Sequence, residues 1–258
     1  MLNLIELRPG SQASLVLIHG TAGSPRSSWE ALMGHMSGDL RVLAFDLSRL
    51  ERLSTGERTV ECLGRWLARQ ISAVVGQAVH LVGFSLGAAL AMEVAAEFPR
   101  QVLSLTLIAP FDNARHPRVR DTFERWQHLL AHTPRELADE IIHQGFSVAY
   151  LNAMTPAQVA DGIEDFFQRV HWPAVAAQVA LDLSLDMTDQ VSRVCCPTAV
   201  IAAEHDQWIP IKISLLLYRR LREGYWFVLP CGHLLTAEAP QALARIIQGF
   251  IARSMTRP

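Results

Sequence analysis

Ser85 lies at the centre of the segment Gly83 to Gly87, which reads Gly-Phe-Ser-Leu-Gly. The apolar run Ala78–Val82 before it is typical of a buried strand, and apolar residues at helical spacing follow it. A strand that turns abruptly into a helix exposes the side chain at the corner, and small residues two positions away let the backbones pass. The helix N-terminus also offers N–H groups to a developing oxyanion. This pattern favours a nucleophilic serine over a tight turn that carries a serine by chance.

A serine hydroxyl is a poor nucleophile at its ordinary pKa, so a base is expected beside it. Of ten histidines, His233 stands out because it follows the predicted strand Tyr225–Leu229 and precedes the last predicted helix. The loops after the carboxyl ends of parallel strands share one edge of the sheet, where Ser85 also emerges. His19 belongs to a glycine turn and is expected to support loop geometry, while His205 adjoins the candidate acid. We therefore predict His233 as the general base.

Asp206 is the predicted acid that orients the imidazole and stabilises its protonated form. It follows the predicted strand Thr198–Ala203, and the order Ser, Asp, His is the one expected for this arrangement of strands. Glu204 and Asp112 are rivals, the latter because it follows the strand Val102–Ala109. A plain loop carboxylate that caps a turn is the alternative interpretation of Asp206.

Two backbone N–H groups are expected to bind the oxyanion. The residue after the nucleophile, Leu86, supplies one, and we assign the second to Thr21 in the glycine-rich segment 19–24. This segment lacks the lysine and the spacing of a phosphate-binding loop.

The elements that must position these residues alternate between apolar runs and amphipathic helical patterns, as in a parallel sheet covered by helices. The alternation stops between residues 111 and 191, where only helical patterns occur and where Thr133 and Thr155 each begin a capping box followed by proline. We predict an α/β fold with a mostly parallel central sheet flanked by helices. Residues 1–110 and 192–258 form the core, and 111–191 form a helical cap insertion.

Composition excludes several classes of protein. Of 258 residues, 50% are hydrophobic and 19% charged, and the formal net charge is −2, which argues for a large core and against a nucleic-acid partner. No apolar run approaches the roughly 20 residues of a membrane span, and no signal peptide is recognised. The four cysteines lack metal-site spacing, so reduced thiols and a cytoplasmic location are expected. Cys231, two residues before His233, is either reactive or, as we favour, a packing residue.

Aromatic residues of the cap are candidates for the substrate pocket. Some are expected to line an apolar acyl site, although packing of the cap on the core is the alternative and is favoured for the pair Phe166 and Phe167. The predicted lining residues are Trp126, Phe146, Tyr150, Phe167 and Trp208. Arginines 115, 118 and 120 either meet a carboxylate or a carrier-protein phosphopantetheine, or form a solvated face.

Four segments together resemble the α/β-hydrolase superfamily: residues 17–21, 83–87, 203–210 and 232–233. The resemblance spans nearly the whole chain. The single helical cap, between what the family counts as its sixth and seventh core strands, is similar to that of small carboxylesterases, enol-lactonases and carbon–carbon bond hydrolases. Two features depart from the family: the segment 47–54 lacks a glycine-rich turn, and one strand instead of two precedes Ser14.

The resemblance implies a serine hydrolase that cleaves a carboxylic ester or thioester of a small or medium apolar acyl group through an acyl-enzyme, without metal or cofactor. The implied partner is a small-molecule substrate, free or bound to a carrier protein. A carbon–carbon bond hydrolase or lactonase using the same triad is one alternative. A non-hydrolytic biosynthetic enzyme or ligand receptor that keeps the fold is another, because fold alone does not determine function.

Overall fold

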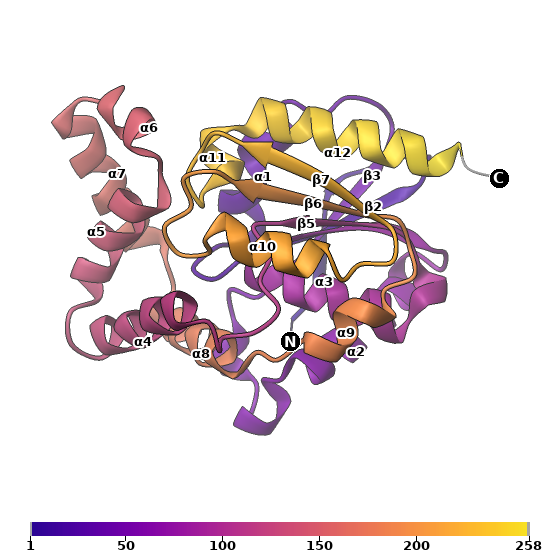
Figure 1. Ribbon diagram of the computed structural model, residues 1–258, viewed down its shortest axis with the longest axis horizontal. Helices are drawn as coiled ribbons and strands as arrows, with labels where there is room; N and C mark the ends of the chain where they lie inside the picture. Colours follow the sequence, from indigo (N-terminus) through magenta and orange to yellow (C-terminus); the bar gives the residue numbers. More distant parts are fainter. Residues whose placement is uncertain (1, 257–258) are drawn as a thin grey trace.

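The computed structural model describes residues 2–256 and is built on a seven-stranded sheet with the order β1-β3-β2-β4-β5-β6-β7 (Figure 1). Strand β1 runs antiparallel to β3 at one edge, and every other neighbouring pair is parallel. The mostly parallel sheet predicted from the sequence is confirmed, with a single strand before Ser14. The strands are β1 (Leu4–Arg8), β2 (Ser14–Ile18), β3 (Arg41–Phe45), β4 (Val79–Phe84), β5 (Val102–Ile108), β6 (Thr198–Ala203) and β7 (Gly224–Leu229).

The central strands are apolar on both faces, as strands covered by helices on both sides must be. Alternate residues of β2 enter different hydrophobic clusters: Val16 and Ile18 join one, and Leu15 and Leu17 join the other. All five residues of β2 are buried. The core is therefore two apolar layers with the sheet between them.

Helices cover both faces of the sheet. Helices α1 (Pro25–Met33) and α12 (Pro240–Met255) pack together on one face, with the short α11 (Leu235–Glu238) beside them. Helix α3 (Leu86–Glu97) lies on the other face, where it packs against α2 (Val60–Val74) and α9 (Thr188–Arg193). Helix α10 (Ile211–Tyr218) follows β6 and contributes to the same layer as α3. Residues 2–256 also contain three short 3₁₀ helices: Leu50–Arg52, Thr55–Glu57 and Pro99–Gln101.

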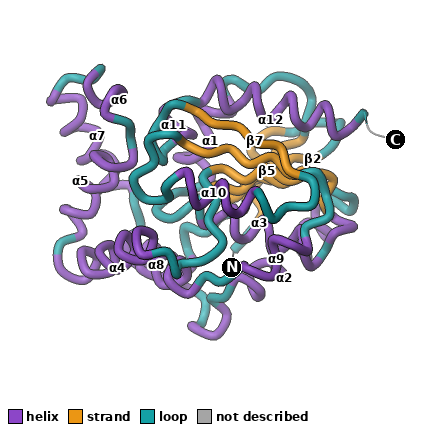
Figure 2. The backbone as a smooth tube through the Cα atoms, in the orientation of Figure 1, coloured by secondary structure: helices purple, strands orange, loops and turns teal. Residues whose placement is uncertain are grey.

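The segment between β5 and β6 contains helices joined by loops (Figure 2), and most of them lie beside the edge of the sheet toward which the arrows of β6 and β7 point (Figure 1). Within it α4 packs against α5 and α8, and α5 packs against α7, whereas α9 packs on α3 of the core. Its helices before α9 are α4 (Pro117–His132), α5 (Pro134–Gly145), α6 (Val148–Asn152), α7 (Pro156–Arg169) and α8 (Trp172–Ser184). We call α4 to α8 the cap.

The two predicted capping boxes differ in outcome. The Gln158 N–H donates to the Thr155 hydroxyl oxygen and the Thr155 N–H donates to Gln158 Oε1, so this box is confirmed. The box at Thr133 is wrong, because that side chain makes no capping hydrogen bond. Thr133 also ends α4, where its own N–H donates to the Leu129 carbonyl. The backbone of Thr133, with φ −142° and ψ 67°, lies outside the extended conformation that a capping residue normally adopts.

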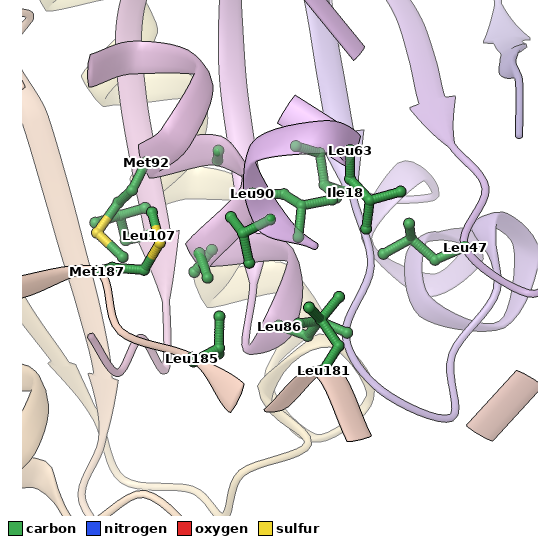
Figure 3. Close-up of a cluster of buried hydrophobic side chains, with 14 of the residues drawn as sticks. Ile18, Leu47, Leu63, Leu86, Leu90, Met92, Leu107, Leu181, Leu185 and Met187 are labelled. Carbon is green, nitrogen blue, oxygen red and sulfur yellow. The ribbon is translucent and has the colours of Figure 1, made fainter. Parts of the chain in front are cut away.

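The end of α8 packs close to the start of α3. Leu181, Leu185 and Met187 belong to the same buried cluster as Leu86 and Leu90 (Figure 3). The cap is thus anchored to the core next to the corner that carries Ser85. No helix within residues 2–256 combines the length and the apolar content that a membrane crossing requires.

The buried His80, in β4, is expected to make the fold less stable at acid pH. Its Nδ1 lies 2.7 Å from the Ser104 hydroxyl oxygen, whereas its Nε2 is buried without a hydrogen-bond partner. Burial lowers the pKa of His80 to about 4. Below the ordinary pKa of about 6.5 the unfolded chain binds a proton that the folded chain does not. His80 therefore does not reduce the free energy of unfolding above pH 6.5. As the pH drops from 6.5 toward 4, it lowers that free energy by about 3 kcal/mol at most.

We expect His80→Asn to remove most of this acid-dependent loss. The measurement is urea denaturation at pH 7.5, 6, 5 and 4, with substitution of the half-exposed His143 (His143→Gln) as the control that keeps the wild-type pH dependence. If the free energy of unfolding fell with pH equally in wild type and His80→Asn, groups other than His80 would cause the loss of stability.

Candidate active site

Ser85 forms the corner between β4 and α3 and has a strained backbone. Its φ of 53° and ψ of −117° lie in a region that non-glycine residues rarely adopt. The turn is so tight that a Cβ on Gly83 would lie 2.3 Å from the Gly87 carbonyl oxygen, and one on Gly87 would lie 2.1 Å from the Ile18 carbonyl oxygen. The two glycines are therefore sterically required, which gives the physical reason for the motif.

His233 lies in the loop after β7 and is held by Asp206, in the loop after β6. The His233 Nδ1–H donates to Asp206 Oδ2 at 2.6 Å, and Asp206 Oδ1 accepts from the Trp208 and Ile209 N–H groups at 2.9 Å each. The imidazole also contacts the ring of Phe84 at 5.2 Å between centroids and that of Trp208 at 4.8 Å. With Nδ1 carrying the proton, Nε2 is left as a proton acceptor.

The rival candidates lie in other surroundings. Glu204 and His205 are exposed, and Asp112 forms an ion pair with Arg220. His19 is buried with both nitrogens occupied: Nδ1 donates to the Gly20 carbonyl at 2.8 Å and Nε2 accepts from the Leu47 N–H at 2.9 Å. The structure thus joins His233 to Asp206, places Ser85 and His233 in the wall of one cavity, and puts the rival candidates in other surroundings.

The two predicted oxyanion donors flank the nucleophile. Leu86 is the first residue of α3, so its N–H has no acceptor within the helix. Thr21 lies after β2 and lines the same cavity as Ser85 and His233. Neither N–H has a hydrogen-bond acceptor in the part of the chain that the structure describes. Both N–H groups are therefore unpaired within residues 2–256.

Two adjoining cavities lie between the cap and the core. The inner cavity has a volume of about 180 Å³ and contains Ser85 and His233 in its wall. The outer cavity, about 480 Å³, extends beneath α6, α7 and α8. Six residues line both cavities and so lie at the boundary between them: Ala22, Gly23, Ser27, Ile142, Phe146 and Phe166.

The predicted substrate-binding aromatics divide between these cavities. Trp126 and Trp208 line the inner cavity in an edge-to-face pair at 4.8 Å, and Phe146 stacks at 4.6 Å on Tyr150, which lines the outer cavity. Phe167 lines neither cavity, because its ring packs at 5.6 Å on Trp172 beneath Arg135. The neighbouring Phe166 takes the cavity-lining position. One helical residue turns a side chain by about 100°, so the pair cannot share a direction.

The three arginines near the cap entrance are engaged with protein groups. Arg115 pairs with Asp186, Arg120 pairs with Glu124, and Arg118 donates to the Gln207 carbonyl. None of the three lines either cavity. Their positions agree with a solvated face.

Three residues that the sequence did not single out hold the site. Glu238 accepts hydrogen bonds from the N–H groups of Gly232 and Ser147, at 3.0 and 2.8 Å, and so joins the histidine loop to the cap. Gln178 and Asp182 of α8 hydrogen-bond to the loop that carries Thr21. A sequence signal existed for the second pair: two polar residues four apart on a largely apolar helix.

Cys231 is a buried thiol beside the histidine loop. All four cysteines are free, and burial raises the pKa of Cys231 to about 12, so its reactive thiolate is suppressed at neutral pH. We expect Cys231→Ala to keep kcat within about twofold, and iodoacetamide at pH 7.5 to modify the exposed Cys195 without loss of activity. Mass spectrometry of the treated protein alongside its residual activity checks this. Inactivation in step with modification of Cys231 would contradict it.

Comparisons with known proteins agree with this architecture. Residues 15–246 match the family described as "Alpha/beta hydrolase family". Pyrrolizixenacetamide deacetylase from Xenorhabdus hominickii is 30% identical over 246 residues, which cover 94% of this chain and 92% of the relative. A pimeloyl-[acyl-carrier protein] methyl ester esterase from Aeromonas salmonicida is 26% identical over 262 residues, covering 95% and 97%.

A thermophilic esterase from Thermogutta terrifontis superposes with a TM-score of 0.82 at 22% identity, covering 99% of this chain and 95% of that structure, which shows the shared fold. The sequence relatives support a hydrolase of ester-type substrates. By its sequence match and its fold, the chain belongs to the α/β-hydrolase family.

Proposed function

We propose that the protein is a serine hydrolase that cleaves a carboxylic ester or thioester of a small or medium apolar acyl group through an acyl-enzyme. Ser85 is the nucleophile, His233 the general base and acid, and Asp206 the orienting carboxylate. The observation that carries the proposal is the shared inner cavity: a strained serine and a histidine fixed by a buried carboxylate both line it.

In the acylation step His233 Nε2 takes the proton of the Ser85 hydroxyl as its oxygen attacks the substrate carbonyl carbon. The carbonyl oxygen gains negative charge and is stabilised by the N–H groups of Thr21 and Leu86. The tetrahedral intermediate collapses, the bond to the leaving group breaks, and His233 gives that group its proton. Water then attacks the acyl-enzyme by the same route and releases the acid and the free serine.

The wall of the inner cavity supports an apolar substrate. Trp126, Trp208 and Leu234 present apolar surface around the inner cavity, whose volume of about 180 Å³ suits a short acyl or aryl group. The outer cavity, continuous in lining through Phe146 and Phe166, has room for a longer portion of the substrate. A carrier-bound thioester would have to reach Ser85 through this outer space.

Hydrolysis of a small amide is the second candidate, favoured by one observation. The relative that is 30% identical over nearly its whole length is named as a deacetylase of an acetamide. An amide differs from an ester in its poorer leaving group, so the same residues would serve, with protonation of the departing nitrogen by His233 becoming more important.

A two-part experiment tests the proposal. Labelling with a fluorophosphonate should attach the probe to Ser85, identified by mass spectrometry, and heat-denatured protein is the control. Nitrophenyl esters from acetyl to octanoyl, acyl thioesters, N-acetyl arylamides, lactones and dienone acids then form a substrate panel. We expect turnover of short esters, with or without N-acetyl amides. Absence of labelling, or turnover confined to lactones or dienone acids, would contradict ester or thioester cleavage as the main activity.

A further inference from the structure

Helix α8 of the cap buries two polar side chains that no catalytic role above uses. Gln178 and Asp182 are only 1% and 0% exposed, and they lie four residues apart, on one face of the helix. Burying polar groups is costly unless they form hydrogen bonds. Both side chains form them with the loop 19–23 that follows β2, the loop that carries the proposed oxyanion donor Thr21.

Gln178 bridges two loops of the core with its two ends. Its Oε1 accepts from the Ala22 N–H at 2.8 Å, and its Nε2 donates to the Leu47 carbonyl at 2.8 Å. Ala22 has a φ of 62°, which a residue with a side chain rarely adopts without support. Leu47 in turn donates its N–H to His19. The amide of Gln178 therefore supports an unfavourable backbone conformation next to Thr21.

Asp182 holds the side chain of Thr21 itself. The Thr21 hydroxyl donates to Asp182 Oδ2, while Asp182 Oδ1 is buried without a hydrogen-bond partner. Burial raises the pKa of Asp182 well above its usual value, which favours the neutral carboxyl over an unpaired buried charge. A buried carboxyl group with a single hydrogen bond contributes little to the stability of α8. Its one contact, with Thr21, is therefore the feature of Asp182 that needs an explanation.

The peptide unit between Gly20 and Thr21 explains what these contacts achieve. Its carbonyl oxygen accepts from His19 Nδ1 at 2.8 Å and from the Gly23 N–H at 3.1 Å. Because a trans peptide is planar, fixing the Gly20 carbonyl also fixes the Thr21 N–H, which points the opposite way. Gln178 and Asp182 fix the residues on the other side of this unit. The loop is thereby restrained at both ends of Thr21.

We propose that Asp182 and Gln178 are positioning residues: they hold loop 19–23 in the conformation that aims the Thr21 N–H at the substrate oxyanion, and so make helix α8 of the cap a working part of the oxyanion hole. This proposal rests on acyl transfer at Ser85. Contacts that align a donor for the transition state, and leave the substrate's apolar groups alone, affect kcat far more than KM. Complete loss of an oxyanion donor reduces kcat by roughly 10² to 10³.

The kinetic test uses nitrophenyl acetate with Asp182→Ala, Asp182→Asn, Gln178→Ala and Thr21→Val. We expect Asp182→Ala and Gln178→Ala to lower kcat by about 10- to 100-fold, with KM changed by less than about threefold. Asp182→Asn still accepts the Thr21 hydrogen bond and should recover most of kcat. Combining Asp182→Ala with Thr21→Val should lower kcat no further than either change alone, since both remove one bond.

The matched control is Glu140→Gln, which alters another buried carboxyl of the cap. Glu140 pairs with Arg125 between α4 and α5 and does not touch loop 19–23. Its kcat should stay near the wild-type value. Each variant is normalised to folded protein by circular dichroism. If Asp182→Ala does not fold, Thr21→Val removes the same hydrogen bond from the side of the loop.

Hydrogen exchange separates failure of this inference from failure of the proposed function. Peptides covering residues 19–24 should exchange faster in Asp182→Ala and Gln178→Ala than in wild type or Glu140→Gln, because the Ala22 and Gly23 N–H groups lose protection. If the wild type shows neither turnover nor labelling but exchange behaves as stated, the loop restraint holds and acyl transfer fails. Unchanged exchange with a kcat within threefold, or equal losses of kcat for Asp182→Asn and Asp182→Ala, would overturn the positioning role.

Discussion

Ser85→Ala is expected to lower turnover of a cleaved ester by about a millionfold, to the level left by binding and the oxyanion donors alone. The substitution removes the attacking oxygen and nothing else. Ser85 makes no side-chain hydrogen bond within residues 2–256, and its backbone N–H bond to the Ile108 carbonyl, at 2.9 Å, is retained. We therefore expect the thermal unfolding midpoint to stay within a few degrees of wild type. Steady-state kinetics and differential scanning calorimetry on the same preparation measure both quantities.

Ser28→Ala is the matched control for this experiment, because Ser28 lines the same inner cavity. It should keep kcat within a few-fold of wild type. If Ser85→Ala retained a tenth or more of the wild-type rate, the nucleophile would have to be another group, and the assignment of the triad would fail with it.

Asp206→Asn is expected to lower kcat by about 10⁴-fold, the largest effect after that of Ser85→Ala. Two backbone N–H groups, of Trp208 and Ile209, donate to Oδ1, so the amide oxygen of asparagine would occupy that position. Its NH₂ group would then face His233 Nδ1, where Asp206 Oδ2 now accepts. A donor there forces the imidazole proton to Nε2, the nitrogen that must accept the proton from Ser85.

Measurement of kcat for Asp206→Asn and for Glu204→Gln separates the acid from its exposed neighbour. Glu204→Gln should leave kcat unchanged. A small loss in Asp206→Asn together with a large loss in Glu204→Gln would reverse the assignment, and neutron diffraction or imidazole NMR of the Asp206→Asn variant reports the tautomer directly.

Much of the core could be predicted from the sequence because each local signal had one structural solution. The run Ser14–Ile18 is buried at every position and apolar at its last four, which is typical of a strand covered on both faces. The glycines at 83 and 87 are sterically required by the turn, so they identified the corner without any knowledge of the sheet. Asp206 and His233 could then be placed, because loops after parallel strands share one edge.

The sequence predicted that the cap is helical, but not which neighbours its helix faces contact. Helical periodicity shows which residues share a face, but not whether that face meets the core, another cap helix or a cavity. This is why Phe166 and Phe167 could not be told apart as cavity-lining residues. The sequence analysis did not single out Gln178 and Asp182, whose one signal was their polarity on an apolar helix, and their partners Ala22 and Thr21 are more than 150 residues away in the chain. Contacts at such separation follow from the fold as a whole.

The carboxylate of Glu238 has a consequence for how substrate enters. It bonds at once to the start of α6, through Ser147, and to Gly232, next to the imidazole-bearing residue. The Leu234 N–H also donates to the Gly145 carbonyl at 2.9 Å, so one backbone bond and the Glu238 carboxylate together join the cap to the histidine loop along a seam. A movement of the cap that broke these contacts would also displace the histidine loop, and with it His233, from its position beside Ser85. If the triad acts as we propose, passage of substrate and product through the outer cavity would leave these contacts in place and keep His233 aligned with Ser85.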